Sequence, residues 1–300
     1  MQLFQNCPSC GCAHFLNVLS VCDHSISGET FQIASCSACG LKLTLDAPGE
    51  HGISPYYQST AYISHTDGNA TFFEKTYQWV RALALRSKRN LIQQYTRLPR
   101  GTLLDMGCGT GAFLSTMKKA GWTVHGMEPD AGARIKAARA AQQEVLDPSG
   151  LQALPDHAMD VITLWHVLEH VHDLDHMLHT IKRLLTKNGV AFIAVPNSDS
   201  SDARWYGSNW AAYDVPRHLY HFTPSTLSDL LNRYGLRVDR MLPMHFDPFY
   251  VCLLSEKYRS GSMRPLRSLT LATASFLIAL FQKQRSSSLI YVVRTFMPGN

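Results

Sequence analysis

The sequence predicts an α/β fold: a doubly wound, Rossmann-like, mostly parallel sheet that follows a small cysteine-rich module. Strand and helix patterns alternate between residues 101 and 255, which is typical of a parallel sheet covered by helices on both faces. A glycine-rich turn, L-L-D-M-G-C-G-T-G over residues 103–111, follows the first of these strands. Six of the eight cysteines fall within the first forty residues, and this crowding indicates that the N-terminus is a separate module.

Charge and composition divide the chain into four parts. The expected parts are a cysteine module (1–45), a linker loop with an amphipathic helix (46–100), a cofactor-binding domain (101–255) and a basic, apolar, helical extension (256–300). Residues 72–100 and 256–300 each sum to +6, whereas residues 1–50 and 101–255 each sum to −3. Because nucleic-acid binding requires Lys and Arg to replace counterions, nucleic acid is not expected as a partner of the module or the domain.

The cysteine module contains two C-x-x-C-G knuckles, Cys7 to Gly11 and Cys36 to Gly40. The tight turn in each knuckle lets both thiolates reach one ion, and two knuckles complete a tetrahedral Cys₄ zinc site. We expect a structural zinc held by Cys7, Cys10, Cys36 and Cys39, with a hairpin of 13–21 and 30–34 between the knuckles. A redox C-x-x-C is the alternative. Cys12 and Cys22 are expected to be bystanders, although Cys12 could replace Cys10.

Periodicity predicts the elements in order. Residues 46–71 form a Gly-, Pro-, Ser- and Tyr-rich loop, and apolar residues at helical spacing predict an amphipathic helix over 72–95. The expected strands are 102–106, 123–127, 144–146, 159–165, 189–195 and 236–242. The expected helices are 112–120, 131–141, 174–185 and 224–234. Such a sheet places its site at the carboxyl ends of the strands.

The glycine turn indicates a nucleotide-like cofactor. Gly107, Gly109 and Ala112 satisfy the dinucleotide pattern G-x-G-x-x-G/A. The turn alone therefore does not exclude an NAD-dependent enzyme. Asp105, two residues before the first glycine, favours a different cofactor. Glu128 ends the second strand about 20 residues past the turn, where an acid accepts hydrogen bonds from both ribose hydroxyls.

On these residues the chain resembles the class I S-adenosylmethionine (SAM) methyltransferases, whose first motif has this D-x-G-x-G-x-G shape. The resemblance covers residues 100–245. It implies that Asp105 lies near the methionine amino group of SAM and that Gly107, Gly109 and Gly111 pack against the methionine and ribose. Glu128 and Trp165 complete the cofactor-binding set. The cysteine module is similar to the N-terminal zinc modules of some sugar C-methyltransferases.

Residues 165–170, W-H-V-L-E-H, follow the fourth strand. The letters match the H-x-x-E-H pattern of some zinc proteases, but their place at a strand end beside a SAM-type turn excludes that interpretation. The segment resembles the E-x-x-E-H motif of quinone O-methyltransferases, which can hold a divalent ion. His166 stands where that motif has its first Glu, so a metal bound here would show a weaker preference for Mg²⁺.

A long stretch, residues 198–222, separates the fifth strand from the next helix, and its length marks it as functional or flexible. Trp205, Tyr206, Trp210 and Tyr213 are expected to offer flat surfaces to a ring-bearing or lipid-like substrate, and the other candidates are Asp214, Arg217, His218 and His221. Methyl transfer to a hydroxyl requires removal of its proton. The candidate bases are His166, His170 and His218.

The segment 266–281 is mostly apolar and is flanked by Arg and Lys. It is shorter than the roughly 20 residues of a bilayer span, so we expect peripheral contact with a membrane, a cover for the substrate pocket or a dimer contact. The N-terminus lacks a charged start followed by an apolar run, so no secretory signal is expected. The expected location is the cytoplasm, with peripheral membrane contact as an addition.

The predicted function is SAM-dependent methylation of O, C or N of a small, hydrophobic or ring-containing metabolite. The first alternative is a ribosomal RNA base methyltransferase with a zinc module. The acidity of the module opposes it, as does the lack of an Asn-Pro-Pro-Tyr-type box at the fourth strand. Further alternatives are a non-catalytic SAM-binding or zinc-mediated interaction protein and an NAD-dependent reductase.

Overall fold

The structure of the protein is a computed structural model, which describes residues 3–57 and 72–296 and, for residues 72–81, the backbone alone. Part of the expected linker, residues 58–71, lies outside the described residues. The centre of the molecule is a six-stranded sheet with the order β5-β4-β6-β7-β10-β9. Its strands are β4 (Thr102–Met106), β5 (Thr123–Met127), β6 (Met159–Trp165), β7 (Leu185–Pro196), β9 (Leu236–Pro243) and β10 (Ser288–Thr295).

Strands β5, β4, β6 and β7 run parallel, and β10 is antiparallel to both of its neighbours. The mostly parallel sheet predicted from the sequence is therefore confirmed. The short strand expected at 144–146 is reduced to one parallel bridge between Met127 and Leu146. The sheet consequently ends at β5.

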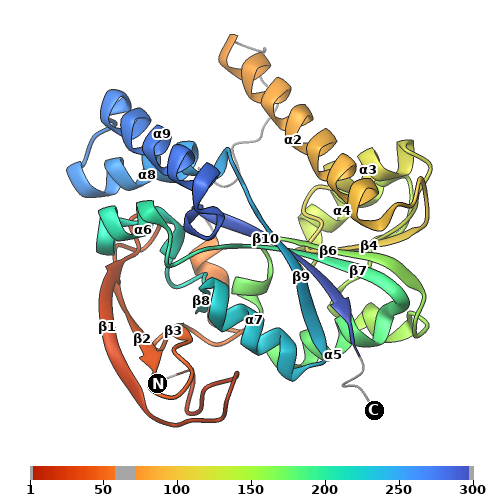
Figure 1. The fold of residues 1–300 in the computed structure, drawn as a ribbon, viewed down its shortest axis with the longest axis horizontal. Coiled ribbons are helices and arrows are strands. Elements are labelled where there is room, and N and C mark those ends of the chain that lie inside the picture. The colour runs from red at the N-terminus through yellow and green to blue at the C-terminus, as the bar shows by residue number, and fades with distance from the viewer. Residues whose placement is uncertain (1–2, 58–71, 297–300) are drawn as a thin grey trace.

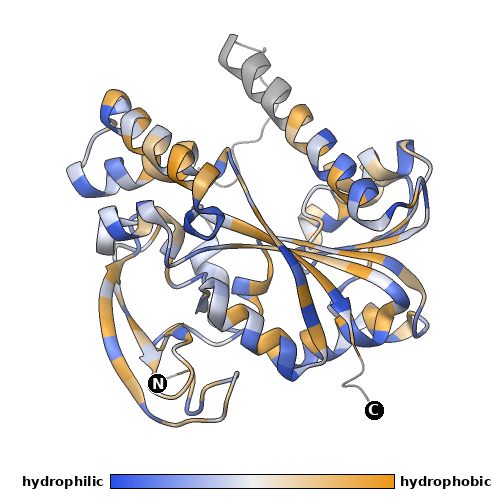
Figure 2. Ribbon diagram, in the orientation of Figure 1, coloured by the Kyte–Doolittle hydropathy of each residue, from blue (hydrophilic) through white to orange (hydrophobic). Residues whose placement is uncertain are grey.

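Helices cover both faces of the sheet (Figure 1). One face carries α2 (Phe72–Thr96), α3 (Ala112–Lys119) and α4 (Ala131–Ala141), and the other carries α5 (Leu174–Leu184) and α7 (Pro224–Arg233). Successive strand residues point to opposite faces, so Leu103 packs with α3 and Leu104 packs with α5. Because both faces are buried there, β6, β7 and β10 contain long apolar runs, which Figure 2 shows as orange through the centre of the molecule.

The C-terminal part differs from the expected helical extension over 256–300. The segment does include α9 (Pro265–Phe281), which follows α8 (Asp247–Ser260). However, Ser288–Thr295 is strand β10, which pairs with β7 on one side and β9 on the other. The apolar run Leu289 to Val293 is buried within the sheet, so the domain closes only at β10 and the two helices are an insertion between β9 and β10.

The N-terminal hairpin is present as predicted, but it is joined to the rest of the chain. Strands β1 (Phe15–Cys22), β2 (Thr30–Cys36) and β3 (Lys42–Thr44) form an antiparallel sheet, and its fourth strand is β8 (Tyr220–His221) from the long stretch after β7. The short helical elements are η1 (Ser54–Tyr57), η2 (Pro148–Ala153), η3 (Leu168–His170), α6 (Ser201–Tyr206), η4 (Gly207–Asn209), η5 (Ala211–Tyr213) and η6 (Lys283–Arg285).

Candidate functional site

The glycine turn joins β4 to α3, and its three glycines have positive φ angles of 67°, 55° and 78°. A Cβ atom at Gly107 would lie 2.5 Å from the Cγ2 of Val167, and one at Gly111 would lie 2.7 Å from the Cα of Ala137. A Cβ at Gly109 would meet nothing within 4 Å. The outer two glycines are thus needed for close packing, whereas the middle one borders open space that a ligand can enter.

Glu128 lies at the end of β5, opposite this turn. Its Oε2 accepts a hydrogen bond of 2.8 Å from the backbone nitrogen of Gly109, and its Oε1 accepts one of 3.1 Å from that of Asp130. Burial raises the pKa of Glu128. A carboxylate offers about four lone-pair sites, so two acceptor positions remain for the hydroxyls of a ribose.

Asp105 is buried at the end of β4, where its Oδ1 accepts a hydrogen bond of 2.6 Å from the hydroxyl of Thr163 on the neighbouring strand. Burial raises the pKa of Asp105 to about 7, although the hydrogen bond from Thr163 and the charge of Lys88 oppose this shift. A buried carboxyl group with a raised pKa favours a cationic partner, because a nearby positive charge would lower that pKa toward its ordinary value.

Trp165 lies at the carboxyl end of β6, the strand next to β4 in the sheet. Its ring meets Phe113 edge to face, with 5.6 Å between centroids, and the Nζ of Lys88 lies 4.2 Å from its centroid. The indole nitrogen is buried and has no hydrogen-bond partner among the residues described. Lys88 comes from α2 and was not among the predicted site residues, because the sequence predicted only an amphipathic helix there.

His166 directly follows β6 and is held by two carboxylates. Its Nδ1 lies 3.3 Å from the Oε1 of Glu169, and its Nε2 lies 3.3 Å from the Oδ2 of Asp247 at the start of α8. Burial lowers the pKa of His166, but the two carboxylates outweigh burial and raise the pKa to about 10. The protonated ring uses both nitrogens as donors, so this arrangement opposes a role for His166 as a base.

His170 and His218 lie against each other, with ring centroids 4.5 Å apart. The Nδ1 of His170 lies 3.0 Å from the carbonyl oxygen of Arg217, and the Nδ1 of His218 lies 2.9 Å from that of Ala212. Because a carbonyl oxygen only accepts, each Nδ1 carries a proton. Burial, and then the charge of His218, lower the pKa of His170 to about 4, which leaves a lone pair on its Nε2 at neutral pH.

Glu169, His170 and His218 can each offer a ligand atom within 4.8 Å of the others. The Oε2 of Glu169 is buried and lacks a hydrogen-bond partner in the described part of the chain. This donor set differs from the one expected from the sequence, because His218 joins Glu169 and His170 while His166 is engaged by Asp247. Two imidazoles and one carboxylate suit a transition metal better than Mg²⁺.

Comparison with known families identifies the family of the chain. A family model described as "Methyltransferase domain" matches residues 77–240, which is more than half of the chain and includes the glycine turn, Glu128 and the three histidines. The chain belongs to this methyltransferase family. Together with its relatives, the family assignment makes the protein a SAM-dependent methyltransferase of class I.

Two curated relatives of this methyltransferase are ubiquinone biosynthesis O-methyltransferases. The one from Photorhabdus laumondii is 27% identical over 176 residues, which cover 53% of this chain and 70% of the relative. The one from Vibrio cholerae is 26% identical over 173 residues, which cover 53% and 69%.

Solved structures show the same fold at low sequence identity. The magnesium protoporphyrin IX methyltransferase of Synechocystis PCC 6803, with bound SAH, aligns over 80% of this chain and 97% of its own, with 15% identity and a TM-score of 0.50. The [4+2]-cyclase SpnF aligns over 83% and 97%, with 18% identity and a TM-score of 0.51. A cyclase with this architecture illustrates that the fold does not determine the reaction.

The aromatic residues of the long stretch in this methyltransferase do not form the flat substrate surface that we expected. Tyr206, Trp210 and Tyr213 are buried and pack against Val21, Phe31 and Ile33 of the N-terminal hairpin. The indole nitrogen of Trp210 donates to the carboxylate of Asp202, at 2.8 Å. The expectation is therefore wrong for these three residues, because they form the interface between the module and the domain, and Trp205 alone of the four is exposed.

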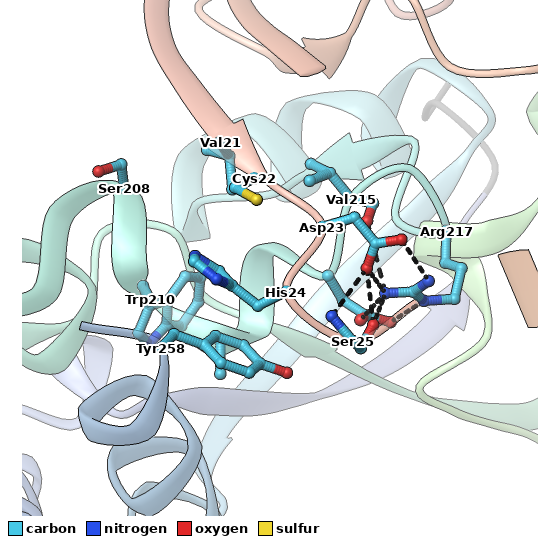
Figure 3. A pocket seen from close by; sticks show the side chains of 12 residues that line it. Val21, Cys22, Asp23, His24, Ser25, Ser208, Trp210, Val215, Arg217 and Tyr258 are labelled. Carbon is cyan, nitrogen blue, oxygen red and sulfur yellow. Dashed lines mark hydrogen bonds and ion pairs between the residues drawn. The ribbon is translucent and has the colours of Figure 1, made fainter. Parts of the chain in front are cut away.

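Arg217 has a structural place in the same interface. Its guanidinium is buried between Asp23 at the end of β1 and Asp214, with nitrogen to oxygen distances of 3.0 and 2.6 Å, as Figure 3 shows for Asp23. The adjacent cavity of about 10 Å³ is large enough for one water molecule and too small for a substrate. His221 is also structural, since its Nε2 lies 2.9 Å from the hydroxyl of Thr44.

The four cysteines expected to bind zinc come together. One sulfur atom from each of Cys7, Cys10, Cys36 and Cys39 lies within 4.8 Å of the others, with 3.6 Å between Cys7 and Cys39 and 3.5 Å between Cys10 and Cys36. Tetrahedral zinc with Zn–S bonds of about 2.3 Å requires sulfur atoms about 3.8 Å apart, so this donor set fits zinc. Cys12 and Cys22 lie outside the cluster of four.

Proposed function

We propose that this methyltransferase transfers a methyl group to O, C or N of a small, hydrophobic or ring-containing metabolite. The observation that carries the proposal is that neutral His170 lies beside His218. Both residues lie on segments that follow the carboxyl ends of sheet strands, as the glycine turn does. The names of the curated relatives support it, because ubiquinone is a ring-bearing, lipid-like molecule. A lipid-like acceptor would also account for the apolar surface of α9.

The cofactor SAM supplies a methyl group on a positively charged sulfur. We propose that Gly107, Gly109 and Gly111 let the backbone approach the cofactor closely, that Glu128 accepts hydrogen bonds from the ribose hydroxyls, and that Asp105 binds the methionine amino group. Trp165 would provide an apolar wall. These groups would fix the methyl carbon in line with an acceptor atom at about 3 Å, which is the geometry that displacement requires.

For a hydroxyl acceptor we propose that the Nε2 of His170 takes the proton as the new bond to the methyl group forms. The carbonyl oxygen of Arg217 fixes the ring through its Nδ1, and the low pKa of His170 keeps Nε2 unprotonated at neutral pH. His218 would orient this ring from its edge. General base catalysis of this kind contributes about 10²- to 10⁴-fold to the rate.

We also propose that Cys7, Cys10, Cys36 and Cys39 hold a structural zinc ion. Four protein ligands leave no position for a substrate. The module has only three short strands of its own, and zinc binding would add to its folding free energy.

The function is tested with SAM carrying a labelled methyl group, added with the enzyme to a cell extract that is then separated into RNA, protein, lipid and small molecules. Label in the lipid or small-molecule fraction is expected. Label in RNA would instead establish the base methyltransferase alternative, and absence of label despite measurable SAM binding would indicate a non-catalytic protein.

The role of His170 is tested with His170→Ala once an acceptor is known. With a hydroxyl acceptor, kcat is expected to fall by about 10²-fold or more, while the affinity for SAM stays unchanged. The matched control is His176→Ala, which removes an exposed histidine of α5 and should leave both quantities unchanged. Equal rates for the two variants would exclude His170 as the base.

A further inference from the structure

Helix α9 presents its large apolar residues to solvent and its small residues to the protein. The buried positions are Ser268, Ala272, Ser275 and Ala279. The exposed apolar residues, here called the α9 stripe, are Leu266, Leu269, Leu277, Leu280 and Phe281, with exposed fractions of 83, 55, 49, 46 and 88%. A surface helix of a globular protein normally has the opposite arrangement, and Figure 2 shows apolar residues along much of α9.

The stripe runs along one side of the helix, with the exposed Thr270 and Thr273 between Leu269 and Leu277. At about 100° per residue, its five residues fall within one arc of the helix circumference, opposite the buried small residues. A helix of 17 residues is about 26 Å long. Isolated exposed apolar residues are common on protein surfaces, but a row of this length marks a binding surface.

The orientation of α9 is fixed by packing. The small face lies against α8 and α6, and the hydroxyl of Ser275 donates to the buried carboxylate of Asp202, at 3.1 Å. The same carboxylate accepts hydrogen bonds from Trp210 and Ser287. The helix therefore cannot rotate its stripe inward without breaking a buried polar network.

Only positive charges lie next to the stripe in the sequence, and one of them, Arg285, pairs with Asp199 at 2.9 Å. Residues 257–300 contain no Asp or Glu. Arg264 and Arg267 flank the start of α9, and Lys283 and Arg285 follow its end. The nearest acid in the sequence, Glu256, is buried and is already paired with Arg259 at 2.8 Å and Arg267 at 3.7 Å.

We propose that the α9 stripe docks on the surface of an anionic lipid bilayer, with the helix lying parallel to the membrane plane. Leucine and phenylalanine would enter the acyl boundary while the flanking cations meet lipid phosphates, as in amphipathic interfacial helices. A second copy of the chain fits less well, because antiparallel packing of two stripes would bring Arg264 and Arg267 against the partner's basic end. No helix in the described ranges is long and apolar enough to cross a membrane.

This surface lies apart from the glycine turn, so the inference does not depend on which acceptor is methylated. Docking would let the enzyme take an apolar acceptor directly from the bilayer.

Vesicle flotation of the full chain tests the proposal. The probes are vesicles of phosphatidylcholine alone and of phosphatidylcholine mixed with phosphatidylglycerol. The protein is expected to float with the mixed vesicles and to be released by high salt. Replacing both Leu269 and Leu277 by Gln should weaken the binding roughly tenfold or more, because about half of each side chain would otherwise be buried in lipid.

The matched control is Leu16→Gln, which changes an equally exposed leucine of β1 and should leave flotation unchanged. Thermal denaturation and SAM binding check that the variants are folded and that the cofactor site is intact. Failure of the native protein to float, or equal flotation of the double variant, would overturn the proposal. A native dimer that the double variant converts to a monomer would assign the stripe to a second copy instead.

Discussion

The buried guanidinium of Arg217 lies 3.0 Å from the carboxylate of Asp23, although the two residues are separated by 194 positions in the sequence. Asp23 directly follows the first strand of the cysteine module, and Arg217 directly precedes His218. The next residues, Tyr220 and His221, form the strand that pairs with β3. The cysteine module and the histidine segment therefore form one structural unit.

The first prediction concerns this ion pair. Asp23→Asn is expected to lower the free energy of unfolding by about 1.5–3 kcal/mol, because it removes the charge from one side of a buried hydrogen bond while Arg217 keeps Asp214 as its counter-charge. Urea denaturation measures the change. The control Asp46→Asn alters an exposed acid of the same module and should cost less than about 1 kcal/mol. Equal losses in the two variants would contradict the prediction.

The second prediction concerns zinc. The purified protein should contain one zinc ion per chain by elemental analysis, and Cys36→Ser should lose it together with much of its thermal stability. Cys22→Ser, which changes a cysteine outside the cluster of four, should keep a full complement of zinc. Full retention of zinc in Cys36→Ser would exclude this site.

Local patterns predicted the parts of the fold that depend on neighbouring residues. The glycine turn, the alternating strands and helices, and the two knuckles are all encoded over short spacings, and the structure has each of them. The ion pair of His166 with Asp247 could not be predicted, because it joins segments about 80 residues apart. The tautomer of His170 could not be predicted either, because it depends on the carbonyl oxygen of Arg217, 47 residues away. Aromatic residues such as Trp210 were misassigned because the sequence does not show which surface a loop covers.

Strand β10 was also missed, although its signal is present. The run L-I-Y-V-V over residues 289–293 is rich in β-branched residues, which is typical of a buried strand. The preceding apolar helix led us to assign the whole segment to a helical extension. Because the long insertion of α8 and α9 separates β9 from β10 in the sequence, no local pattern shows that these two strands pair.

The third prediction separates two glycines of the turn. Gly111→Ala should destabilise the fold, because its Cβ would lie 2.7 Å from the Cα of Ala137. Gly109→Ala should cost only the roughly 1–2 kcal/mol of a left-handed backbone, yet it should abolish measurable SAM binding by occupying the open side of the turn. Calorimetry and thermal denaturation distinguish the two effects. Normal SAM binding by Gly109→Ala would show that the cofactor does not lie against this residue.

The fourth prediction concerns Glu128. Glu128→Gln is expected to weaken SAM binding by roughly 10- to 100-fold, because hydrogen bonds to a charged acceptor contribute about 1.5–3 kcal/mol. Isothermal titration with SAM measures the loss. Asp130→Asn is the matched control, since this residue caps α4 through the backbone nitrogen of Ala133 and Asn is an equally good cap. A similar small effect in both variants would remove Glu128 from the cofactor site.

The last prediction is a pH dependence of cofactor affinity. Burial raises the pKa of Asp105 to about 7, so this carboxyl is mostly protonated at pH 6 and ionised at pH 8. The amino group of SAM is mostly charged up to about pH 7, because α-amino groups have pKa values of about 7.7–8.0, and it should bind only the ionised form of Asp105. The affinity should therefore be roughly fivefold weaker at pH 6 than at pH 7, since about a tenth of this carboxyl is ionised one pH unit below its pKa and about half at the pKa.

Calorimetric titration with SAM across this range measures the slope. The variant Asp105→Asn should bind SAM weakly, and its affinity should lack this dependence, because the amide does not titrate. Glu128 titrates in both proteins, so the difference between their slopes is what reports on Asp105. A slope that survives in Asp105→Asn would assign the titration to another group and would place the amino group of SAM away from Asp105.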